Sequence, residues 1–234
     1  MVYYNERFSI DFGFCSGREE GMASEYLTIR ENGTGEYEEK KSRFLGEAVH
    51  VESEKEASDY VAAVRKRYYD ARHHCYAWVI GEGADRKKSS DDGEPSGTAG
   101  QPILRVIEGS ACTNILVIVT RYFGGTLLGT GGLVRAYTQA ARAAVENAGI
   151  VRMCLCRKLA VTVDYASLDK LQYELRREGI ETGPTDYGAK VTLHLTVESD
   201  RAGALTDKIT ALTSGGAQID LEEEGFFPIG MQSP

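Results

Sequence analysis

Long hydrophobic runs are missing from this 234-residue chain. The longest uninterrupted aliphatic run is Ile115 to Val119, whereas a helix that crosses a membrane needs about 20 apolar residues. The first 22 residues mix acidic and basic side chains and contain no apolar stretch of signal-peptide length. We therefore expect a cytoplasmic protein without a membrane partner.

A regular cysteine framework is also missing. The chain has 5 cysteines, and Cys154 and Cys156 have no second pair at the spacing of a zinc site. Free cysteines in proteins of reducing compartments are mostly small buried hydrophobic residues. We expect that role for Cys154 and Cys156.

Positive charge is in deficit. The net charge of −8 opposes simple electrostatic capture of nucleic acid, because that affinity comes from neutralised phosphates. We expect no sequence-specific DNA binding. Charges are screened beyond about 8 Å at physiological salt, so a local patch is still able to bind phosphates. The residues of the candidate patch are Arg65, Lys66, Arg67, Arg72, Arg86, Lys87 and Lys88.

The common catalytic signatures are absent too. The chain has no His-Glu-x-x-His, Gly-x-Ser-x-Gly or paired Cys-x-x-Cys motif. His73, His74 and Cys75 are adjacent, and successive residues of a strand point to opposite faces, so the three cannot converge on one ion. The sequence predicts no catalytic residue, no metal and no cofactor, and it favours a binding protein over an enzyme.

The length predicts two α+β domains. We place them at residues 24–150 and 153–222, with a tail at 223–234. The first 22 residues show no regular period, and they are interpreted as a disordered extension or a mis-chosen start. A short strand or helix docked on the first domain is the alternative.

The first domain combines strands and amphipathic helices. Residues 43–51 alternate as a strand, and Ser53 with Glu56 forms a capping box for a helix that extends to Tyr68. The later elements are a strand at 75–80, a loop or marginal hairpin at 82–97, a helix at 98–108 with a Thr98–Gln101 capping box, a buried strand at 114–123, a glycine-rich connection at 124–132 and a helix at 133–148.

The second domain has a compact pattern of its own. Its predicted elements are a strand at 159–163, a helix at 168–178, strands at 181–187 and 190–198, a helix at 205–214 and a strand at 217–221. The order β-α-β-β-α-β is that of the ferredoxin-like fold.

Residues 92–100 form the first candidate binding loop. In a functional interpretation its carboxylates contact a partner from the surface, whereas in a structural one the glycines allow a tight connection and Thr98 caps the next helix. The candidate residues are Asp92, Gly93, Glu94, Pro95, Gly97, Thr98 and Gly100.

Residues 121–132 form the second candidate loop. Its glycines lie between a buried strand and a helix start, where backbone N–H groups attract anions, although close helix–strand packing is an equally open explanation. The motif is neither a P-loop nor a dinucleotide fingerprint. The candidate residues are Arg121, Tyr122, Gly124, Gly125, Gly129, Gly131, Gly132 and Arg135.

Three sequence strings together resemble the IMPACT/YigZ family. They are Lys40-Lys41-Ser42-Arg43-Phe44, then Asp92-Gly93-Glu94-Pro95-x-Gly97-Thr98-Ala99-Gly100-x-Pro102, then Val119 to Gly125 followed by Gly129-x-Gly131-Gly132-Leu133-x-Arg135-Ala136-Tyr137. The resemblance covers about residues 24–230. It implies a first domain like the second domain of ribosomal protein S-five and a ferredoxin-like second domain, a pair similar to the fourth and fifth domains of elongation factor G.

The resemblance also implies a class of function. Eukaryotic relatives regulate translation through an additional N-terminal domain that we do not expect here, so that partnership is not transferred. We expect a non-catalytic protein, linked to translation regulation, that binds the ribosome, RNA or a translation-associated protein. The alternative is an enzyme on a phosphorylated or peptide-like small molecule, with residues 124–132 as anion site and Asp92 or Glu94 as base.

Overall fold

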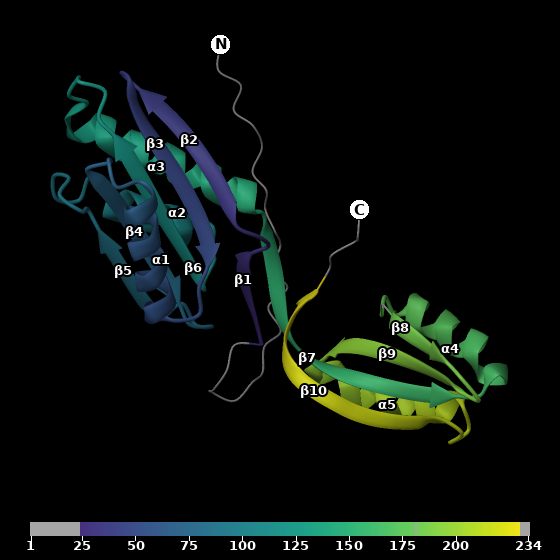
Figure 1. Ribbon diagram of the computed structural model, residues 1–234. Helices are drawn as coiled ribbons and strands as arrows, with labels where there is room; N and C mark the ends of the chain where they lie inside the picture. The colour runs from purple at the N-terminus through teal and green to yellow at the C-terminus, as the bar shows by residue number, and fades with distance from the viewer. Residues whose placement is uncertain (1–23, 181, 230–234) are drawn as a thin grey trace, which may run out of the picture.

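The structure, a computed structural model, describes residues 24–180 and 182–229. Two α+β units, each with its own sheet, are joined by the long strand β7 (Ile150–Val163) (Figure 1). The expected two-domain α+β fold is confirmed. None of the helices within the described residues is long and apolar enough to cross a membrane. The predictions for the first 22 residues lie outside the described part of the chain.

A five-stranded antiparallel sheet forms the centre of the first domain. Its strands in spatial order are β2 (Gly33–Glu39), β3 (Ser42–His50), β6 (Ile115–Tyr122), β4 (His73–Ile80) and β5 (Arg86–Ser90). The aliphatic run of β6 is buried on both faces, as predicted. Because β5 pairs with β4, the segment predicted as a loop or a hairpin is a hairpin.

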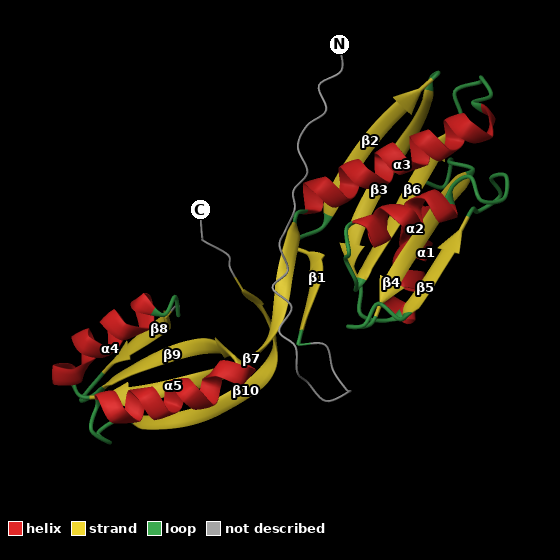
Figure 2. Ribbon diagram, turned by 180° about the vertical axis from the view of Figure 1, so that it is seen from behind, coloured by secondary structure: helices red, strands yellow, loops and turns green. Residues whose placement is uncertain are grey.

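Helices cover both faces of this sheet. α1 (Glu54–Arg67) lies on one face, and α2 (Gly100–Gly109) and α3 (Gly129–Ala148) lie on the other (Figures 1 and 2). Leu116 and Ile118 of β6 pack with α1, whereas the residues that alternate with them pack under α2 and α3. The predicted cap of α1 is confirmed, since the Ser53 hydroxyl accepts the backbone N–H of Glu56 at 3.2 Å.

Glycines in β2 and β3 allow α3 to lie close to the sheet. A Cβ at Gly46 would lie 2.5 Å from the carbonyl oxygen of Ala140, and one at Gly35 would lie 2.5 Å from the backbone nitrogen of Ala144. Real Cβ atoms do not approach other atoms so closely. These glycines and the facing alanines therefore set the distance between α3 and the sheet.

The second domain has the predicted order of elements. After β7 follow α4 (Tyr165–Arg177), β8 (Thr182–Tyr187), β9 (Val191–Glu198), α5 (Ser199–Leu212) and β10 (Gln218–Ile229). The strands lie in the order β8-β9-β7-β10, all antiparallel, and the two helices pack on one face over a common apolar core. The β-α-β-β-α-β pattern is confirmed.

Two strands, β7 and β10, extend by more than five residues beyond their predicted bounds. β7 begins at Ile150 because its first half pairs with β1 (Glu25–Ile29) on one side and with the end of β10 on the other. β10 continues to Ile229, so residues 223–229 belong to a strand and not to a tail. These pairings join segments distant in sequence, and the periodicity of one segment does not show them.

Candidate binding surface

Several candidate segments meet at the end of the first domain that lies away from β7 (Figure 1). We define this distal end as residues 40–41 in the β2–β3 turn, residues 91–99, and residues 123–135, which include the start of α3. The strand register brings them together, because Arg43 lies opposite Tyr122 and His73 lies opposite Arg121. The two predicted candidate loops are thus neighbours.

Glu94 ties its loop to the interior of the domain. The side chain is only 4% exposed, and its Oε1 accepts hydrogen bonds from Arg121 Nη1 at 2.5 Å and from the Tyr137 hydroxyl at 2.8 Å. The Arg121 guanidinium also lies 5.4 Å from the ring of Phe44 and 5.5 Å from that of Phe123, within cation–π range. The expectation that Glu94 and Arg121 face a partner is wrong, since they form a buried ion pair.

Asp91 caps α2 from a distance. Burial by itself raises the pKa of Asp91, but three backbone N–H donors outweigh burial and hold the pKa below its usual value. These donors, at 2.9, 3.0 and 2.8 Å, belong to Gly97, Ala99 and Gly100. The predicted Thr98–Gln101 capping box is wrong, because the buried Thr98 hydroxyl donates to the carbonyl oxygen of Pro95 instead.

Asp92 holds the loop to α1 and β4. Its carboxylate accepts Arg65 Nη2 at 2.6 Å and the backbone N–H of His74 at 2.7 Å, and its carbonyl oxygen lies 2.9 Å from His73 Nδ1. The geometry gives no support to the alternative in which Asp92 or Glu94 is a general base, because both carboxylates are occupied by cationic or N–H and O–H donors.

Cys75 lies beneath this loop. Its thiol is 2.9 Å from the carbonyl oxygen of Asp91 and 3.3 Å from the Tyr137 hydroxyl. Burial raises the pKa of the Cys75 thiol, and a protonated thiol is a poor nucleophile. The His74 ring has its Nε2 3.1 Å from the carbonyl oxygen of Tyr68 and its Nδ1 3.7 Å from Asp92 Oδ2. The side chains of His73, His74 and Cys75 therefore contact three different carbonyl oxygens, those of Asp92, Tyr68 and Asp91.

The exposed charge of the distal end is positive. Lys40, Lys41 and Arg135 are exposed, and none of them forms an ion pair with another described residue. Gly124 holds the second loop against the β2–β3 turn: its N–H donates to Ser42 Oγ at 3.1 Å, and a Cβ at this glycine would overlap the Lys41 backbone. The lysines and the second loop thus form one continuous surface.

α3 begins earlier than predicted. Gly129, Gly131 and Gly132 belong to its first turn and not to a connecting loop. No side chain caps this end of the helix, and the first turn carries no acidic residue. Phe123 and Leu127, in the loop before the helix, are 50% and 83% exposed. Uncapped N–H groups beside exposed cations form a surface suited to anions.

The other candidates have structural roles or lie at the edge of this surface. Positive φ angles occur at Gly93, Gly97, Gly125 and Gly129. Gly100 packs on the backbone of Ser90. Pro95 is exposed, and the Tyr122 hydroxyl donates to Asp70 at 2.8 Å. In the basic patch predicted around α1 and β5, Arg65, Arg67 and Lys87 form ion pairs with acids of the same domain.

Candidate selection from the sequence missed Lys40, Lys41, Phe123, Asp91 and Tyr137. A Lys-Lys pair in a hairpin turn carries no spacing signal of its own, and both lysines have positive φ. Tyr137 looked like an ordinary apolar position of α3, although its hydroxyl is the second donor to Glu94. Phe123 lies within the second candidate loop, and the fold brings the other four close to the two loops.

Comparisons with known proteins cover both domains. Residues 40–145 match the Impact N-terminal domain, and residues 161–215 match a domain of unknown function, DUF1949. The Bacillus subtilis protein named IMPACT family member YvyE is 37% identical over 85% of this chain and 91% of its own length. The Escherichia coli protein named IMPACT family member YigZ is 35% identical over 79% of this chain and 92% of its own.

A solved structure supports the same assignment. The crystal structure of a protein described only as hypothetical is 33% identical, covers 87% of this chain and 100% of its own, and superposes with a TM-score of 0.57. The match therefore extends over both domains and the strand that joins them.

Proposed function

The chain belongs to the IMPACT family, and from that premise we propose that it is a non-catalytic cytoplasmic protein that associates with the ribosome and regulates translation by binding RNA through its distal end. The observation that carries this proposal is the arrangement of exposed cations around the uncapped start of α3. Lys40 and Lys41 lie in the β2–β3 turn, against which Gly124 holds the loop that precedes α3, and Arg135 lies in the second turn of α3. Phosphate groups are the anions that such a surface fits best.

Exposed apolar side chains favour RNA with unpaired bases over a simple phosphate. Phe123 and Leu127 are exposed beside the cations. Base–aromatic stacking contributes about 1–3 kcal/mol per base in proteins that bind single strands. Phe123 is also held from behind by the Arg121 guanidinium, so its ring is positioned before a ligand arrives.

Gly131 offers a further argument. Outside the adjacent residues and the backbone of its own helix, a Cβ at this position would meet no atom within 4 Å, and the backbone is helical without a positive φ. Alanine in a helix is more stable than glycine by about 0.5–1 kcal/mol. Packing therefore does not require glycine here, whereas close approach of a ligand to the helix backbone does favour it.

Cosedimentation with ribosomes tests the proposal. The triple variant Lys40→Gln, Lys41→Gln, Arg135→Gln removes the exposed cations of the distal end. If each of these cations contacts one phosphate of a single strand, each contributes about 0.7 to the slope of log affinity against log salt. Loss of all three should therefore reduce the magnitude of this slope by about 2. A matched variant, Lys170→Gln, Arg176→Gln, Arg201→Gln, changes the net charge equally at exposed sites of the second domain. Equal binding by the two triple variants would refute the assignment to the distal end.

A second variant separates binding from folding. Gly131→Glu places an acid in the first turn of α3, where the helix dipole favours it by about 0.3–1 kcal/mol. We expect unchanged or slightly higher stability, together with weaker binding to ribosomes and to a single-stranded oligouridine. Retained RNA binding by this variant would contradict a phosphate contact at the start of α3.

A further inference from the structure

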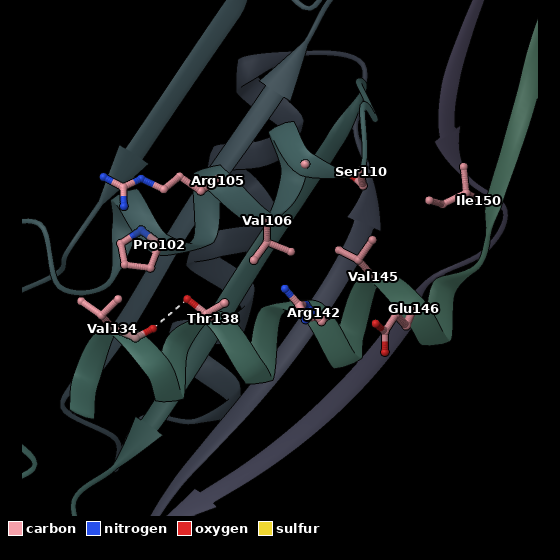
Figure 3. Close-up of a pocket in the computed structure, with 11 residues that line it drawn as sticks. Pro102, Arg105, Val106, Ser110, Val134, Thr138, Arg142, Val145, Glu146 and Ile150 are labelled. Carbon is pink, nitrogen blue, oxygen red and sulfur yellow. Dashed lines mark hydrogen bonds between the residues drawn. The ribbon is translucent and has the colours of Figure 1, made fainter. Parts of the chain in front are cut away.

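A separate groove runs between α2 and α3 on the outer side of the first domain (Figure 3). Its volume is about 410 Å³. Pro102 and Val134 lie at one end and Ile150 of β7 at the other, with Val106 and Val145 between them (Figure 3). The residues of this α2–α3 groove do not belong to the distal end, apart from Val134 at its edge.

The polar side chains inside the groove are already satisfied. The Thr138 hydroxyl donates to the carbonyl oxygen of Val134 at 2.7 Å, as the dashed line in Figure 3 marks, and the Ser110 hydroxyl donates to that of Ile107 at 2.7 Å. Neither hydroxyl has a proton left to donate to a ligand. The groove consequently presents a mainly apolar surface between the two helices.

Cations flank this apolar surface. Arg105 comes from α2 and Arg142 from α3, both are exposed, and neither forms an ion pair with another described residue. Glu146 is the one acidic side chain of the lining and lies toward the Ile150 end. In a chain with a net charge of −8, this local excess of positive charge is complementary to an acidic partner.

The shape of the groove favours a helix as the occupant. Small-molecule sites enclose about 70–90% of their ligand, whereas Val106, Val134, Thr138 and Ser110 are only half-buried along an open trough. The walls are helices, and no residue of the edge strands β2 and β5 lines the groove. An extended peptide would find no strand edge for its backbone, whereas a helix satisfies its own hydrogen bonds.

We propose that the α2–α3 groove docks an acidic amphipathic helix of a partner protein. Its apolar side chains, at helical spacing, fill the trough over Val106 and Val145. Carboxylates that flank them pair with Arg105 and Arg142. This site is independent of RNA binding at the distal end.

A designed peptide pair provides the probe. The acidic peptide has the sequence Glu-Ala-Leu-Glu-Glu-Leu-Leu-Ala-Glu-Leu-Glu-Ala-Leu-Glu with a fluorescent label, and its counterpart carries lysine in place of every glutamate. Fluorescence anisotropy with the full-length protein measures both. We expect saturable binding of the acidic peptide and a loss of about tenfold in affinity when Arg105→Glu and Arg142→Glu are combined.

Reversal of the charges on both the protein and the peptide is the decisive test. The Arg105→Glu, Arg142→Glu protein should bind the lysine peptide better than the original protein does. The control Arg176→Glu reverses an exposed helix arginine of the second domain and should leave both affinities unchanged. The Lys40→Gln, Lys41→Gln, Arg135→Gln variant should also bind the acidic peptide normally, which distinguishes failure here from failure of the RNA proposal.

Other outcomes would overturn the proposal. The first is a lack of saturable binding of the acidic peptide. The second is equal binding of that peptide by the original and the charge-reversed proteins, when urea unfolding shows that both are folded. Competition by a synthetic peptide of residues 1–23 would assign the groove to a segment of the chain itself. Dimerisation abolished by Val106→Asp would assign it to a second copy.

Discussion

Removal of the Glu94 carboxylate is expected to destabilise the first domain strongly. In Glu94→Ala the Arg121 guanidinium, 7% exposed, loses its carboxylate partner at 2.5 Å, and the Tyr137 hydroxyl loses its acceptor at 2.8 Å. Breaking one partner of a buried ion pair costs about 3–5 kcal/mol, because a charge is left buried without compensation. The free energy of unfolding should fall by that amount.

Replacement of both residues of the ion pair tests the coupling free energy between them. Glu94→Leu combined with Arg121→Met removes both charges and keeps side chains of similar length. Such replacement of a buried pair is often neutral or stabilising. The double variant should therefore be more stable than Glu94→Leu alone, and the coupling free energy should reach about 2 kcal/mol, within the range for residues in contact.

Urea unfolding followed by tryptophan fluorescence measures these changes in the correct domain. Trp78 is the only tryptophan of the chain, and it is buried in β4 of the first sheet. Glu36→Ala is the control, since Glu36 pairs with Arg43 at side-chain exposures of 50% and 52%, and exposed pairs contribute about 0–1 kcal/mol. If Glu94→Ala costs no more than Glu36→Ala, Glu94 is a surface carboxylate in solution and the buried pair is refuted.

Three other predictions concern the packing, the cap and the thiols. Gly46→Ala should destabilise the first domain by about 1–3 kcal/mol in the same urea assay, because its Cβ would meet the Ala140 carbonyl, whereas Gly83→Ala, with open space around it, should change little. Asp91→Asn should cost about 1–2 kcal/mol at neutral pH. Because the pKa of Asp91 is lowered in the folded state, its stabilisation is complete above the unfolded pKa of about 3.9 and is lost as the pH falls below that value. Urea titrations from neutral to acidic pH should therefore show the free energies of unfolding of the original and Asp91→Asn proteins becoming equal. Burial raises the pKa of Cys75, Cys112 and Cys154, and that of Cys156 to about 11. A Cys15→Ser variant, which keeps only these four thiols, should therefore react slowly with a thiol reagent at mildly alkaline pH when native and rapidly in urea. Fast reaction of the native protein would show that these thiols are accessible.

Secondary structure was predictable where burial follows a simple period. β9 alternates strictly, with Val191, Leu193, Leu195 and Val197 buried against the helices, and β6 combines an aliphatic run with burial on both faces. The ferredoxin-like order followed from such segments. The long first half of β7 did not, because its stability comes from pairing with β1 and β10, which are distant in sequence.

The sequence indicated which segments form the candidate site but not the role of each side chain in them. Acids and glycines in a short segment are typical of an exposed loop. Glu94 is nonetheless buried because Arg121, 27 positions later, and Tyr137, 43 positions later, converge on it. Asp91 caps a helix that starts 9 residues further on, at Gly100, which lies beyond the short spacing that identifies a capping residue in a sequence.

Asp91, Asp92 and Glu94 bind partners within the domain, and this changes the electrostatics of the distal end. By sequence, Asp91, Asp92 and Glu94 oppose any phosphate-binding patch nearby. In the fold, Glu94 is compensated by Arg121, Asp92 by Arg65 and Asp91 by backbone N–H donors. Lys40, Lys41 and Arg135 are exposed without an ion-pair partner among the described residues, and we infer that they set the local potential, since more distant charges are screened beyond about 8 Å. The affinity for RNA should therefore decrease with salt even though the whole protein is acidic, and an affinity that rises with salt would contradict this account.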